Sequence, residues 1–153
     1  MNHTEHEYDA LRRLTDIEEI KRLKARYFRL VDTKDWQGWR EVFTPDAHVE
    51  IDSVVRTPTA LVRDTREWLA NATTTHVGHM PEIDIQSPDT ATGIWGMADY
   101  IVFPETGGAR QGLRGSGHYH ERYRKIDGSW LIHYLRLDRL RIDLLDGGLP
   151  PAA

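Results

Sequence analysis

The spacing of apolar residues changes along this chain from a helical period to the two-residue period of strands. Over residues 17–31, apolar side chains recur at intervals of three and four, which predicts an amphipathic helix that ends near Asp32. Thr15, with Glu18 three residues later, forms a capping box. The pattern therefore predicts that the first helix begins at Thr15.

Shorter periodic segments follow, and then the strands. The next predicted elements are a helix over 34–43, a short strand over 48–52 and a helix over 58–72. Four longer strands are predicted over 76–85, 91–104, 111–126 and 129–143, with Asp127-Gly128 as a hairpin turn between the last two. Helices followed by antiparallel strands predict an α+β domain. A strongly bent sheet around helices would leave a cavity for a small ligand at its open end.

Composition narrows the class of protein. The chain has 153 residues, of which 39% are hydrophobic and 29% charged, as in a soluble globular domain. A formal net charge of −4 argues against a nucleic-acid partner. No apolar run reaches the roughly 20 residues that cross a membrane. The chain has no cysteine, which favours a cytoplasmic location.

The same patterns divide the chain into one domain and two tails. We predict a polar N-terminal tail over residues 1–12, a single domain over 13–145 and a C-terminal tail over 146–153. The C-terminal segment contains two glycines and two prolines, which suit a frayed end.

Asp32 and His76 are the strongest candidates for catalysis. Asp32 follows the first predicted helix, and His76 opens the first long strand. A carboxylate that orients an imidazole gives a general base that works near neutral pH, because the carboxylate fixes the tautomer of the ring.

The chain also resembles a known family over about residues 14–143. The resemblance rests on residues 20–27, 32–36, 43–47, 75–76 and 123–130. It is a resemblance to the SnoaL-like group of the nuclear transport factor 2-like superfamily. This group includes polyketide cyclases, scytalone dehydratase, bile-acid dehydratase and hexachlorocyclohexane dehydrochlorinase. It implies a cone-shaped α+β barrel, with N-terminal helices packed on a strongly bent, mostly antiparallel sheet. It further implies a small hydrophobic ligand, no cofactor and a homodimer.

The resemblance to scytalone dehydratase includes Asp32 and His76 but not the other polar residues of that enzyme's pocket. That enzyme has an aspartate and a histidine at the positions of Asp32 and His76. Its tyrosine before the aspartate is replaced by Val31, and its second tyrosine and second histidine by Ile51 and Ile101. The pair alone resembles the simpler arrangement in the dehydrochlorinase and in bile-acid dehydratase.

Each member of the pair has an alternative interpretation. Asp32 could cap the following helix instead of lining a pocket. Strict alternation along the strand would put His79 on the buried face and His76 on the exposed one. A β-bulge at Pro81 would reverse this assignment.

Other polar residues fall on predicted strand faces. Asp99 could act as a proton donor among apolar neighbours or face water at a strand end, and Tyr119 could bind a substrate oxygen or fill the core. His118 and His120 have a spacing that can bind metal, but their strand face continues into arginines, so we predict no metal site. Arg139 is assigned to a salt-bridged surface. The predicted substrate-binding residues are Tyr27, His79, Trp95, Met97, Asp99, Tyr119 and Leu135.

These observations lead to one functional hypothesis and one alternative. The hypothesis is a small cofactor-independent lyase or isomerase, in which His76 removes a proton from a hydrophobic, ring-containing substrate and Asp32 orients the imidazole. The alternative is a non-catalytic module of the same fold that binds a small ligand.

Overall fold

The computed structural model describes residues 3–151. Its helices are α1 (His3–Asp32), α2 (Trp36–Glu41) and α3 (Pro58–Trp68). Its strands are β1 (Phe43–Ile51), β2 (Val54–Arg56), β3 (Thr73–Ile85), β4 (Thr90–Val102), β5 (Gly112–Ile126) and β6 (Ser129–Leu144). The four long strands and three helices agree with the predicted order, and β2 is an additional short strand.

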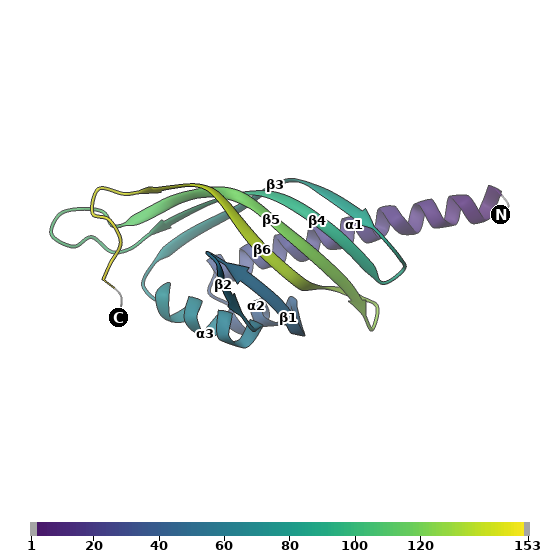
Figure 1. Ribbon diagram of the computed structural model, residues 1–153, viewed down its shortest axis with the longest axis horizontal. Helices are drawn as coiled ribbons and strands as arrows, with labels where there is room; N and C mark the ends of the chain where they lie inside the picture. Colours follow the sequence, from purple (N-terminus) through teal and green to yellow (C-terminus); the bar gives the residue numbers. More distant parts are fainter. Residues whose placement is uncertain (1–2, 152–153) are drawn as a thin grey trace.

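The six strands form one sheet in the order β2-β1-β6-β5-β4-β3. All neighbours are antiparallel except β1 and β6, which run parallel. The sheet curves over the helices, and α1 runs along it and extends beyond it at its N-terminal end (Figure 1). This arrangement confirms the predicted α+β class and the cone-like fold.

The N-terminal segment differs from the prediction. Helix α1 begins at His3, so the described part of the expected tail forms its first turns. Thr15 lies inside this helix, where its hydroxyl donates to the carbonyl oxygen of Leu11 at 2.9 Å. Asp9 pairs with Arg12 and Arg13 one turn later, which supports the helix before the predicted capping box. The first two residues of the predicted tail lie outside the described residues.

The sequence predicted a frayed C-terminal end, but backbone hydrogen bonds hold its described residues in place. The amide of Leu145 donates to the carbonyl of Gly112 at 2.9 Å, and the amide of Gly112 donates to the carbonyl of Gly148 at 2.8 Å. Gly147 donates to Arg110 at 3.0 Å. These bonds attach the segment to the start of β5. The last two residues of the predicted tail lie outside the described residues.

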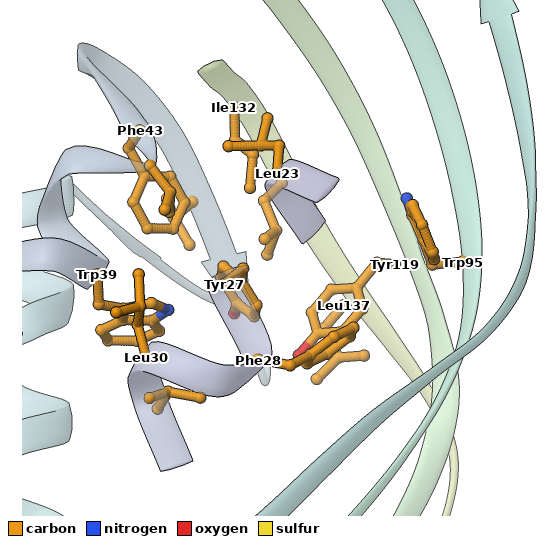
Figure 2. Close-up of a cluster of buried hydrophobic side chains, with 14 of the residues drawn as sticks. Leu23, Tyr27, Phe28, Leu30, Trp39, Phe43, Trp95, Tyr119, Ile132 and Leu137 are labelled. Atoms are coloured by element: carbon orange, nitrogen blue, oxygen red, sulfur yellow. The ribbon is translucent and has the colours of Figure 1, made fainter. Parts of the chain in front are cut away.

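One face of α1 fills the concave side of the sheet. Its buried side chains include Ile20, Leu23, Tyr27 and Val31, at the helical spacing that the sequence predicted. Figure 2 shows Tyr27 and Phe28 turned toward Tyr119 and Leu137 of the sheet, with Trp39 and Phe43 on the other side of the cluster. Helix α1 covers only part of the concave face. The remaining part faces α2 and α3 across a cavity.

Candidate active site

The carboxylate of Asp32 holds the start of β3 through three hydrogen bonds. Its Oδ1 accepts from Nδ1 of His76 at 2.7 Å and from the hydroxyl of Thr74 at 2.8 Å. Its Oδ2 accepts from the backbone amide of His76 at 2.9 Å. Asp32 therefore does not cap α2, whose N-terminal amide at Gly38 donates instead to Asp35 at 2.9 Å.

These hydrogen bonds keep Asp32 ionised. Burial alone would raise its pKa, but the bonds from the His76 ring, the His76 amide and Thr74 outweigh burial, so the pKa is lowered. The charged carboxylate can only accept, so Nδ1 of His76 carries the proton and Nε2 is the nitrogen that can act as a base. The side chain of His76 is 10% exposed.

A β-bulge in β3 determines which histidine faces inward. The pairing of β3 with β4 shifts between Gly78 and Pro81, and the inward positions change there from even to odd numbers. His76 precedes the bulge and faces inward. His79 lies on the outer surface, where its ring covers Gly96, so the alternative that placed His79 in the pocket is corrected.

His76 lines a cavity of about 280 Å³ between the sheet and the three helices. Its apolar wall includes Val31, Leu61, Leu69, Ile101 and Leu137. This apolar wall suits a small hydrophobic ligand, and the imidazole is one of several polar groups that line the rest of the cavity.

A buried ion pair forms a second polar part of the same cavity. Asp99 lies directly opposite His76 on the neighbouring strand β4, and its carboxylate accepts two hydrogen bonds from Arg139 of β6, at 3.1 and 2.9 Å. The side chain of Asp99 is 2% exposed, so it does not face water at a strand end. Its main partner is the Arg139 guanidinium rather than apolar side chains, and Arg139 also bonds Asp52 at 3.1 Å. The assignment of Arg139 to the protein surface is therefore corrected.

Gly115 of β5 makes this ion pair possible. A Cβ at this position would lie 2.2 Å from Oδ1 of Asp99 and 2.3 Å from Nη1 of Arg139. The pair thus occupies the space that any side chain on the intervening strand would fill.

Two tyrosines place phenol groups at the cavity. Tyr27 of α1 and Tyr119 of β5 both line it, and their rings meet edge to face at 5.9 Å. Burial raises the pKa of both phenols, so both stay protonated. Both phenols line the cavity, so each keeps an O–H that can donate to a ligand oxygen.

Three residues predicted to bind substrate are core residues instead. Trp95, Met97 and Leu135 are buried, but the cavity does not reach them, because α1 covers their part of the concave face. The indole of Trp95 donates to the hydroxyl of Tyr123 at 2.8 Å. Leu137, one inward position beyond Leu135, does line the cavity.

Two further observations concern metal binding and membrane crossing. Within residues 3–151, no group of three or more His, Cys, Asp or Glu side chains is placed to hold a metal ion, and His120 pairs with Asp138 at 3.3 Å. Over the same residues, the helices are too short or too polar to cross a membrane.

The fold and the cavity define the class of protein: a small α+β domain with a His–Asp pair beside an apolar wall. Comparison of the sequence with known families then identifies the family. The SnoaL-like domain family matches residues 12–136, so the chain belongs to the SnoaL-like family. The curated relative "Probable cyclase FGR4" of Gibberella zeae is 29% identical over 139 residues, which cover 82% of this chain and 92% of the relative.

Two solved structures extend the comparison. A protein of unknown function from Mycobacterium tuberculosis is 31% identical, with a TM-score of 0.71 over 84% of this chain and 78% of its own. Hexachlorocyclohexane dehydrochlorinase from Novosphingobium barchaimii is 19% identical, with a TM-score of 0.75 over 93% of this chain and 99% of its own, which shows a shared fold. Membership of this family supports a lyase- or cyclase-type role.

Replacing Thr74 by Val tests the environment of Asp32. The substitution removes one hydrogen bond to the carboxylate, so we expect the pKa of Asp32 to rise and the free energy of unfolding at pH 7 to fall by about 1.5–3 kcal/mol. A lowered pKa stabilises the fold above the unfolded value of about 3.9, and this contribution is lost as the pH falls through the folded value. The difference between the two proteins should therefore shrink below about pH 4. Carbon-13 NMR titration and urea unfolding measure both effects.

Thr75→Val is the matched control, because Thr75 is exposed on the other face of the same strand. Equal effects of the two substitutions on the Asp32 titration would contradict the described hydrogen bond.

Replacing Gly115 by Ala tests the buried ion pair. The new methyl group would separate Asp99 from Arg139, and breaking a buried pair typically costs about 3–5 kcal/mol. Gly96→Ala on the outer face of β4 should stay within about 1 kcal/mol, because the Cβ meets only the movable ring of His79. Denaturant unfolding of the two variants compares these losses, and a Gly115→Ala protein as stable as Gly96→Ala would refute this account.

Proposed function

We propose that the protein is a cofactor-independent lyase or isomerase of the dehydratase or cyclase type. The observation that carries this proposal is the 2.7 Å hydrogen bond from Nδ1 of His76 to Asp32 beside an apolar cavity. The bond leaves Nε2 of His76 as a base, and the ionised carboxylate stabilises the imidazolium that forms when the base takes a proton.

The substrate class follows from the walls of the cavity. Apolar side chains suit a hydrophobic ring, and the O–H groups of Tyr27 and Tyr119 suit a carbonyl oxygen of that ring. His76 would remove a proton from the carbon next to the carbonyl while a tyrosine O–H donates to the oxygen, where negative charge develops. The imidazolium would then give this proton to a hydroxyl on the next carbon, whose C–O bond breaks to release water and leave an unsaturated ketone.

The relatives support this type of chemistry. One bears the name of a cyclase, and a structural neighbour is a dehydrochlorinase. Proton removal followed by loss of a leaving group would be a related reaction. The homodimer that the family resemblance implies stays a prediction.

We expect the protein to accelerate loss of water from 3-hydroxy-1-tetralone, a small bicyclic β-hydroxyketone. Removal of the proton at C2 and departure of the C3 hydroxyl as water give an enone that tautomerises to fluorescent 1-naphthol. His76→Ala and Asp32→Asn should lower kcat at least tenfold and up to about 10⁴-fold, since general-base catalysis contributes about 10²–10⁴-fold.

His79→Ala is the matched control, because this neighbouring histidine lies on the outer surface. Its kcat should equal that of the unmodified protein. Full activity in a folded His76→Ala variant would eliminate the catalytic proposal. Tight binding of the ketone with no turnover would favour the alternative of a ligand-binding module.

A further inference from the structure

Lys24 and Glu121 form an ion pair inside the protein, behind the wall of the cavity. Both side chains are 0% exposed, and Nζ of Lys24 bonds Oε1 of Glu121. Neither residue lines the cavity. Two buried charges of this kind are costly to desolvate.

The pair ends a continuous hydrogen-bonded network. The second oxygen of Glu121 accepts from the hydroxyl of Tyr123, which accepts in turn from the indole of Trp95 at 2.8 Å. The network joins α1, β4 and β5, so the position of the Lys24 ammonium group is fixed from the sheet side.

The ammonium group lies against both tyrosines of the cavity. Nζ of Lys24 is 3.7 Å from the ring centroid of Tyr27 and 3.7 Å from that of Tyr119. Phe28 is farther away, at 4.9 Å. A cation over a ring face is attracted by the π-electrons, and the attraction strengthens when water is excluded. Figure 2 shows how closely the rings of Tyr27, Phe28 and Tyr119 are grouped.

Stability alone does not account for this arrangement. Replacing a buried ion pair by neutral groups of similar volume is often neutral or stabilising, whereas removing one partner is strongly destabilising. A requirement to hold the two phenol rings face-on to one cation would explain the retention of the charges.

We propose that the Lys24–Glu121 pair is a positioning element for the tyrosine hydroxyls of the cavity. Lys24 holds the rings of Tyr27 and Tyr119 in the orientation that presents one O–H to a carbonyl oxygen of the ligand. Neither Lys24 nor Glu121 touches the ligand. This inference rests on the proposed function, because it concerns the oxygen-binding wall of the same cavity.

The test compares two ring compounds that differ in one oxygen, 1-tetralone and tetralin. Dissociation constants are measured for both with the unmodified protein and with the double variant Lys24→Met/Glu121→Gln. This variant removes both charges, keeps the side-chain volumes and leaves an amide oxygen as acceptor for Tyr123. Its melting temperature should stay within a few degrees of the original value.

The unmodified protein should prefer 1-tetralone by roughly three- to tenfold, the range of one hydrogen bond. In the double variant this preference should fall to about one, while the affinity for tetralin is unchanged. A purely structural role would change the melting temperature or both affinities together, but not the ratio. The single variant Lys24→Met should melt at a lower temperature, because it leaves Glu121 unpaired.

Asp16→Asn/Lys125→Met is the matched control. It removes another ion pair between α1 and β5, at 2.8 Å, which lies away from the cavity and in which Asp16 is buried and Lys125 partly buried. This control should retain the preference for 1-tetralone. A retained preference in the Lys24→Met/Glu121→Gln variant would overturn the positioning role and leave the proposed function intact. A lack of preference in the unmodified protein would overturn both, because the cavity would then have no oxygen-binding wall.

Discussion

The anchoring of α1 on β3 by the carboxylate of Asp32 is the interaction on which the site depends. Strand β3 lies at an edge of the sheet, so one side of it has no neighbouring strand to accept its amides. Asp32 accepts the amide of His76 and, with the same carboxylate, its ring. One charged group therefore fixes the end of the helix, the edge of the sheet and the tautomer of the imidazole.

The rest of the cavity follows from how α1 fills the cone. The helix covers the concave face as far as its last turns, and the free space begins beside Tyr27 and Val31. On the sheet side, the absence of a side chain at Gly115 admits the ion pair between Asp99 and Arg139. The cavity therefore combines an apolar wall with polar groups, among which His76, Asp99 and Arg139 are held in place by their neighbours.

The sequence predicted the elements that local periodicity determines, and the family resemblance predicted Asp32 and His76. Strict alternation along β3 favoured His79, but a bulge in this strand reverses the inward positions. The bulge is defined by the pairing of β3 with β4, which the sequence of β3 alone does not show. Arg139 was assigned to the surface, although it continues the inward series of Leu135 and Leu137. Its partner is 40 residues away, and the space for it depends on a glycine of a third strand. Lys24 falls in the apolar repeat of the first helix, between Ile20 and Tyr27, and this position is a local sign of a buried charge.

The nitrogen-15 chemical shifts of the His76 ring give the most direct test of the central claim, that Asp32 makes His76 a base with a fixed tautomer. They should be measured in the neutral imidazole, with His79 as an internal reference on the exposed face of the same strand. The account predicts a protonated Nδ1 and an unprotonated Nε2 in His76, and a mixture of tautomers in His79. A protonated Nε2, or the same averaged shifts for both histidines, would contradict it.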